Sequence, residues 1–209
     1  MIDKIQLQRN IELIETNIKR ALAKTGGKRE DLTLIAVTKM HPVEVLQTAL
    51  ECSLKSLGES RIQESLKKQE IITETADWHL IGHLQSNKAK QAAGNFSLIH
   101  SIDSLKLAAE LQKQCDKKDV TQNILIQVNT SEEDSKFGNS PEEAVSLVEE
   151  IAKFRRLYIQ GLMTIGLYTD DEEEIRREFR LLRHLFEDLK NRNIPGVEMK
   201  YLSMGMTND

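Results

Sequence analysis

The stretch Leu32–Leu50, LTLIAVTKMHPVEVLQTAL, places a short apolar run directly before a helix start. Leu32–Lys39 is rich in aliphatic and β-branched residues, which predicts a buried strand. Pro42 suits the first turn of a helix that continues to about Leu50, because the amide hydrogen that proline lacks would be unbonded there anyway. A strand followed at once by a helix is the repeating unit of parallel α/β folds.

The same alternation runs along the rest of the chain. An amphipathic helix precedes it, with apolar residues on one face from Leu7 to Leu22 and with Gly26 and Gly27 at its end. Acidic residues at 170–174 predict a helix start, where the dipole favours negative charge, rather than a metal site. Further predicted strands are Ser56–Glu59, Trp78–Gly82, Leu98–Ile102, Ile124–Asn129, Ile159–Ile165 and Tyr201–Met204. Further predicted helices are Arg61–Ile72, Asn87–Ala93, Ser104–Lys117, Pro141–Phe154 and Glu172–Asn191.

Strands that alternate with helices predict a parallel sheet with helices outside it. Two α/β architectures fit, an open doubly wound sheet and a (β/α)8 barrel of the TIM type. Seven strands are one short of that barrel, and the 209-residue chain stops directly after the seventh. Such barrels usually need ~250 residues and at least ~200. We therefore expect one barrel domain over residues 1–209, with an extra N-terminal helix and with the eighth strand in a C-terminal segment that the sequence lacks.

The composition is that of a soluble globular protein, with 39% hydrophobic and 30% charged residues. The net charge of −4 provides no basic field for nucleic acid. We find no apolar run long enough to cross a membrane and no secretory signal. Cys52 and Cys115 lack a CxxC spacing, so we expect reduced thiols and a cytoplasmic protein.

Lys39 is the most informative single residue. It follows an apolar strand, and the carboxyl ends of parallel strands line the ligand sites of α/β folds. Partial desolvation there lowers the pKa of an amine and makes it a nucleophile that can form a Schiff base. The alternative is a lysine that extends past the strand end to water. From this stretch alone the alternative is favoured.

Polar residues also occur at later strand ends. Gln127 and Asn129 share one face of a predicted strand, so they either bond to neighbours or face a ligand. Met163 lies near the end of the next strand, in the glycine-containing stretch GLMTIG. Ser203–Thr207, SMGMT, could hold a phosphate through backbone N–H groups and two hydroxyls. Taken alone, that stretch is more typical of an ordinary turn.

Two further groups have less specific patterns. His79 and His83 have a spacing seen in zinc sites, but we expect no metal, because no cysteine or acid lies at ligand spacing. A histidine near a cofactor or in the core is the better interpretation. Glu59 ends a predicted strand and could pair with Lys39 or Arg61. The chain lacks the glycine-rich motifs of dinucleotide-binding and P-loop proteins and the GxSxG motif of hydrolases.

These motifs together resemble the pyridoxal-phosphate homeostasis proteins, also called the PROSC or YggS-like family. The resemblance runs in order along almost the whole chain. It is carried by AVTK (Ala36–Lys39), GES..QE (Gly58–Glu64), WHLIGHLQSNK (Trp78–Lys88), QVNTSEEDSKFG (Gln127–Gly138), GLMTIG (Gly161–Gly166) and LSMGMTND (Leu202–Asp209).

The resemblance implies a barrel similar to the N-terminal domain of alanine racemase. It implies pyridoxal 5′-phosphate (PLP) as the cofactor, held by Lys39 as an internal aldimine, with Ser203 and Thr207 at the phosphate. The full set of cofactor-binding residues that we predict is Lys39, Ser60, His79, Asn129, Met163, Ser203, Gly205, Met206 and Thr207. Two departures from the family stand out: Ser60 replaces the usual asparagine, and the family's last strand, with its Arg-Ile-Gly-Thr motif, is absent.

The family is thought to buffer or deliver PLP inside cells, without an established catalytic activity. A PLP enzyme also needs a positioned acid or base, which racemases of similar fold take from a second domain and a partner subunit. We see neither in the sequence, and therefore predict a monomeric carrier without catalytic residues that hands PLP to apo-enzymes. The alternatives are a small PLP-dependent amino-acid racemase or lyase, and a cofactor-free barrel that binds phosphorylated metabolites. Lys88 and Lys136 are interpreted as ordinary loop lysines.

Overall fold

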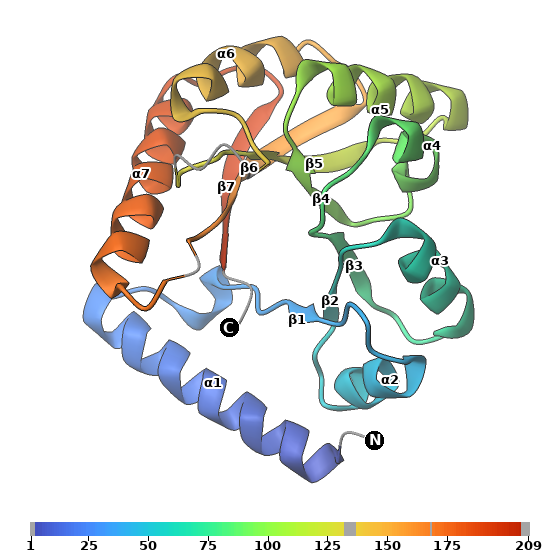
Figure 1. The fold of residues 1–209 in the computed structure, drawn as a ribbon, viewed down its shortest axis with the longest axis vertical. Coiled ribbons are helices and arrows are strands. Elements are labelled where there is room, and N and C mark those ends of the chain that lie inside the picture. The colour runs from blue at the N-terminus through green and yellow to red at the C-terminus, as the bar shows by residue number, and fades with distance from the viewer. Residues whose placement is uncertain (1–2, 132–136, 168, 206–209) are drawn as a thin grey trace. The chain divides into compact units, whose positions relative to one another are not determined.

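The computed structural model describes residues 3–131, 137–167 and 169–205. Contacts along the chain divide it into two compact units, Met1–His79 and Leu80–Asp209. In both, strands and helices alternate in chain order (Figure 1). The strands among the described residues are β1 (Ala36–Val37), β2 (Ser56–Glu59), β3 (Asp77–Leu80), β4 (Leu98–Ile102), β5 (Gln122–Gln127), β6 (Leu157–Ile165) and β7 (Val197–Gly205). The helices are α1 (Lys4–Thr25), α2 (Val43–Glu51), α3 (Ile62–Ile71), α4 (Ala89–Ala92), α5 (Leu105–Lys118), α6 (Pro141–Ile151) and α7 (Glu172–Asn191), with short 3-10 turns η1 (Arg29–Asp31) and η2 (Ser86–Lys88).

The first unit contains a small sheet in the order β1-β2-β3. β1 and β2 are parallel, with Ala36 opposite Leu57. Leu46 of α2, Leu57 of β2 and Ile72 after α3 form a buried cluster, against which Trp78 packs. Burial of one such side chain contributes ~1.5–3 kcal/mol, so this cluster stabilises the packing of α2 against β2.

The second unit contains the parallel strands β4, β5, β6 and β7 in chain order. Helices α5, α6 and α7 lie together on one side of these strands (Figure 1). Each helix contributes a fully buried aliphatic residue, Leu111, Val148 and Leu182 respectively. The opposite sides of the helices are polar, which is the pattern expected where helices cover a parallel sheet.

Side-chain caps explain where several helices begin. Asp3 accepts a hydrogen bond from the backbone N of Ile5 at the start of α1, and Ser140 accepts one from Glu143 at the start of α6. Asp171 accepts from the backbone N–H groups of the following turn at the start of α7. The acidic residues at 170–174 therefore begin a helix, as their position in the sequence predicts.

The predicted order of strands and helices is confirmed, but the bounds of five strands were wrong, and only β2 and β4 match their predicted ranges. β1 has only two residues instead of Leu32–Lys39, and Leu32 and Val37 are 44% and 46% exposed. In the described part of the chain β1 pairs only with the short β2, so few residues can join a ladder. β7 is longer than predicted because it pairs with the nine-residue β6 along most of its length. The strand predicted to reach Asn129 ends at Gln127.

Cys52 and Cys115 are both free thiols in the structure. Among the helices of the described residues, none combines the length and apolar character that a membrane crossing requires.

Candidate functional site

Lys39 lies in a turn that follows β1, rather than at the end of a long strand. Its side chain is half-buried. The next residue, Met40, has a φ of 64°, in the left-handed region that costs roughly 1–2 kcal/mol for a residue with a Cβ atom. Within the described ranges, neither a hydrogen bond nor an ion pair occupies the Lys39 amine. The turn therefore presents a half-buried amine that is available to react.

Glu59 does not pair with Lys39 or Arg61, so that prediction was wrong. Its Oε1 lies 2.7 Å from Lys68 Nζ and also accepts a 2.7 Å hydrogen bond from Thr38 Oγ1. The Glu59 side chain is fully buried and that of Lys68 is 7% exposed. The reason is the face of α3 on which Lys68 lies, because Ile62 and Ser65 precede it at helical spacing on the same buried side.

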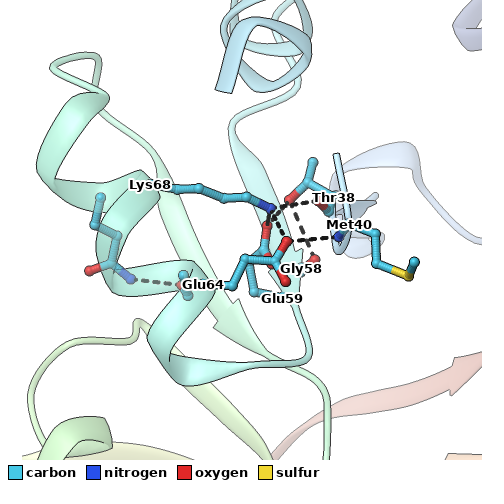
Figure 2. Close-up of polar contacts among 8 residues, drawn as sticks. Thr38, Met40, Gly58, Glu59, Glu64 and Lys68 are labelled. Carbon is cyan, nitrogen blue, oxygen red and sulfur yellow. Dashed lines mark hydrogen bonds and ion pairs between the residues drawn. The ribbon is translucent and has the colours of Figure 1, made fainter. Parts of the chain in front are cut away.

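The Lys68 amine also contacts the turn that carries Lys39 (Figure 2). It donates to the backbone oxygen of Thr38 at 2.9 Å and to Glu64 Oε1 at 2.7 Å. Glu64 Oε1 in turn accepts a 2.8 Å hydrogen bond from the backbone N of Met40. The hydrogen bond from Lys68, with a smaller contribution from that of Met40, holds the pKa of Glu64 below its usual range, although burial acts in the opposite direction. We call Thr38, Glu59, Glu64 and Lys68 the Lys68 cluster.

Ser60 and His79 are the other predicted site residues of the first unit. Ser60 directly follows β2 and is half-buried. His79 lies on β3 and is 8% exposed. Burial lowers the pKa of the His79 imidazole, while the nearby charge of Asp77 acts in the opposite direction. Because β1 and β2 are parallel, Lys39 and Ser60 follow strand ends at the same edge of that pair.

In the second unit, a row of side chains crosses the sheet at one level. Gln127 of β5 is opposite Met163 of β6, which is opposite Ser203 of β7. Residues in register on parallel strands point to the same face. Ser203 Oγ lies 2.9 Å from His100 Nδ1, and Met163 packs in a cluster with the half-buried Tyr201. The structure thus brings Met163 and Ser203 together, as the predicted site requires.

Gln127 and Asn129 bond to neighbouring groups. Gln127 Nε2 donates to the backbone oxygen of Phe137 at 3.1 Å. Asn129 Oδ1 accepts from both the backbone N and the hydroxyl of Ser131, at 3.1 Å and 2.9 Å. The sequence allowed either bonds to neighbouring groups or contact with a ligand. The structure shows bonds to neighbouring groups for both residues.

Gly205 ends β7, and its backbone oxygen accepts a hydrogen bond from Gly166 N at 3.0 Å. This contact joins Gly166, which follows β6, to Gly205, the last residue of β7. Lys88 is half-buried at the end of η2. The predicted site residues Met206 and Thr207, and also Lys136, lie outside the described residues.

His83, the second histidine of the predicted pair, contacts Phe137 and Asp103. Its ring stacks on Phe137 at 3.8 Å between centroids, and its Nδ1 lies 3.3 Å from Asp103 Oδ2. Asn139 donates to the backbone oxygen of Asp103 beside this pair. Among the described residues, no group of three or more His, Cys, Asp or Glu side chains is placed to bind a metal.

Three residues of these sites, Glu64, Lys68 and His100, were not identified from the sequence. Glu64 and Lys68 are four residues apart on a helix, and a lysine on the buried face of α3 was the signal that could have revealed them. His100, a polar residue within the fully buried strand LIHSI, was the signal for the contact with Ser203.

Comparison with known proteins places the chain in a family. Residues 9–209 match the family described as "Alanine racemase, N-terminal domain". A pyridoxal phosphate homeostasis protein of Aquifex aeolicus is 38% identical over 193 residues, which cover 92% of this chain and 84% of that protein. A protein of the same name from Haemophilus influenzae is 34% identical over 208 residues, covering 98% and 87%.

Solved structures share the fold. A crystal structure of a protein from Bifidobacterium adolescentis has a TM-score of 0.93 at 30% identity and covers all of this chain and 90% of that one. PipY of Synechococcus elongatus with PLP bound has a TM-score of 0.79 at 29% identity, covering 91% and 89%. An alanine racemase of Clostridium difficile is 15% identical, with a TM-score of 0.70 over 85% of this chain and 52% of that one, and so shows the fold alone. The chain therefore has the α/β fold of the alanine racemase N-terminal domain, with seven strands among its described residues.

Proposed function

Because the chain belongs to the family of pyridoxal phosphate homeostasis proteins, we propose that it binds PLP and serves to buffer or deliver this cofactor. The observation that carries the proposal is the placement of Lys39 in a turn after β1, with a half-buried amine that no ion pair occupies within the described ranges. PipY, a structural relative, is known with PLP bound, which supports the same ligand here.

The amine of Lys39 is the proposed covalent attachment point. PLP supplies an aldehyde, which condenses with an amine to form a C=N bond with loss of water. The amine that would make this attack is half-buried and has no hydrogen-bond or ion-pair partner within the described ranges. The turn at Met40 limits the directions in which the side chain can extend.

The remaining contacts are proposed from the family resemblance. Ser203 and Gly205 are assigned to the phosphate, together with Met206 and Thr207. The hydroxyl of Ser203 and the backbone N–H groups near Gly205 are of the kind that binds phosphate oxygens. The residues assigned to the rest of the cofactor are Ser60, His79, Asn129 and Met163.

A carrier is favoured over an enzyme by the curated relatives, which are called homeostasis proteins. We propose that the chain turns over amino acids slowly or not at all, and that apo-enzymes receive its PLP. A monomer in the cytoplasm fits that role. The second candidate is a PLP-dependent racemase, which the family match and the fold of alanine racemases favour.

Visible absorbance, transfer of PLP to an apo-enzyme and exchange of α-hydrogens together test the proposal. PLP added to the purified chain is expected to give a yellow protein that transfers the cofactor to a PLP-free apo-enzyme and restores its activity. The holo-protein is expected to leave the α-hydrogens of amino acids unexchanged in deuterated water. Rapid exchange would favour the racemase, and a colourless protein would favour a barrel that binds phosphorylated metabolites without a cofactor.

A further inference from the structure

We propose that Lys68 is a positioning residue, which orients Lys39 by fixing the two peptide groups on either side of it. The inference rests on the proposed function, because it assigns Lys68 to the same PLP-binding amine. Its evidence is independent of that function and lies in the hydrogen bonds of the Lys68 cluster (Figure 2).

The two peptide groups that flank the Lys39 Cα atom are both bound by this cluster. The peptide before Lys39 contributes the Thr38 oxygen, which accepts from Lys68 Nζ at 2.9 Å. The peptide after Lys39 contributes the Met40 N–H, which donates to Glu64 Oε1 at 2.8 Å. Since Lys68 also donates to that same Glu64 oxygen at 2.7 Å, one ammonium group anchors both peptides. Fixing both peptide planes fixes the backbone dihedrals of Lys39 and hence the direction of its Cα–Cβ bond.

All three N–H donors of the Lys68 ammonium are used, by Thr38, Glu59 and Glu64. Two more hydrogen bonds connect Thr38 to β2. Thr38 Oγ1 donates to Glu59 Oε1, and the backbone N of Thr38 donates to the backbone oxygen of Gly58. A turn bound through this many partners cannot rotate at Lys39 without breaking hydrogen bonds. Those from Lys68 to Thr38 and Glu59 are buried, whereas that from Met40 N to Glu64 is exposed.

Stability alone does not account for such a cluster. A buried ion pair often contributes no more than well-packed apolar side chains of the same volume, because the charges must be removed from water. The cluster also leaves Glu59 Oε2 without a hydrogen-bond partner among the described residues. Apolar side chains in place of this cluster could not bind the Thr38 oxygen or accept the hydrogen bond from Met40 N.

Met40 indicates that the turn itself is held by this cluster. Its φ of 64° is unfavourable for a side chain, and that side chain is 83% exposed. Packing therefore does not offset the strain, whereas the hydrogen bond from Met40 N to Glu64 can. Without the cluster the turn would keep the 3.2 Å hydrogen bond from His41 N to the Thr38 oxygen but would lose its anchor at Met40, which frees Lys39 to point elsewhere.

The test compares Lys68→Met with Lys67→Met, which removes the same charge from an exposed neighbour on α3. Two ligands are titrated, PLP and pyridoxine 5′-phosphate, an analogue whose alcohol cannot form the bond to Lys39. Lys68→Met is expected to weaken PLP binding at least tenfold, which corresponds to the loss of one hydrogen bond to a charged group. Its affinity for pyridoxine 5′-phosphate is expected to stay within about twofold of wild type, since positioning of Lys39 affects only the covalent bond.

Equal weakening for both ligands would indicate a purely structural role and would overturn the inference, as would no change for either. If Lys68→Met fails to fold, as judged by the fluorescence of Trp78, Glu64→Ala replaces it. That variant removes the acceptor for Met40 N but leaves the buried Lys68–Glu59 pair, and the same comparison of ligands applies. A wild-type protein that forms no covalent bond with PLP would instead contradict the proposed function.

Discussion

His79 lies beside Trp78 on β3, and its burial has a consequence for stability. Burial lowers the pKa of His79 below the ordinary value of 6.5, so the unfolded chain binds this proton more readily than the folded one. Stability should therefore fall as the pH is lowered through and below 6.5. We expect the midpoint of urea unfolding to decrease between about pH 7.5 and pH 5.5. Trp78, the only tryptophan of the chain, reports this directly by its fluorescence.

The variant His79→Gln should flatten this dependence, because glutamine does not titrate. His184→Gln, at an exposed position of α7, is the matched control and should leave the dependence unchanged. An unfolding midpoint that is equally steep with pH in wild type and His79→Gln would show that another group is responsible.

At the scale of single residues, the partners of buried charges could not be predicted from the sequence. Lys39 was singled out as the end of a strand Leu32–Lys39, but β1 ends at Val37 and Lys39 lies in the turn after it. Glu59 was assigned the wrong partner, because Lys68 is close to it only when α3 folds back along β2. Which charges meet in a buried cluster depends on such packing and not on spacing in the sequence.

Gly161 shows how one element depends on its neighbour. It lies on β6 opposite Tyr201 of β7, at an irregularity in the pairing, with a φ of 144°. A Cβ atom at this position would lie 1.9 Å from the backbone oxygen of Tyr201. Because a backbone oxygen in a ladder cannot move aside alone, Gly161→Ala should disrupt the pairing of β6 and β7. We expect a loss of ~3 kcal/mol or more in the free energy of unfolding, measured by circular dichroism in urea.

Gly196→Ala is the control for backbone strain without collision. Gly196 also has a positive φ, of 82°, but a Cβ atom there would meet Ala152 O at an ordinary 3.4 Å. Its cost should be about 1–2 kcal/mol, that of the left-handed conformation alone. If the two alanine variants were equally stable, the close approach of β6 and β7 at Tyr201 would be ruled out.

At the level of elements, the alternation of apolar runs and helical patterns predicted the order of strands and helices. The helix α7 agrees with its predicted range Glu172–Asn191 at both ends, and α6 begins at the predicted Pro141 but ends three residues before the predicted Phe154. Strand lengths were less predictable, because the ladder partner decides where a strand ends. β1 is short beside the short β2, whereas β7 extends along the long β6.

For the whole molecule, no single motif determined the fold or the function. Seven alternating strands fit both an open sheet and a barrel. The stretch around Lys39, taken alone, favoured a lysine that extends to water over a cofactor-binding residue. The order of motifs along the chain decided between these alternatives, and the family match over residues 9–209 confirms that resemblance. The TM-score of 0.93 with a relative at 30% identity indicates the same fold despite extensive sequence change.

The central claim is that PLP binds covalently to Lys39. Incubation of the protein with PLP, reduction with borohydride and peptide mapping by mass spectrometry locate the attachment residue among all lysines. We predict the reduced pyridoxyl phosphate group on the peptide that contains Lys39, its loss in Lys39→Ala and its retention in Lys88→Ala. Unlabelled Lys39 in the wild type, or a label that persists undiminished in Lys39→Ala, would contradict the account.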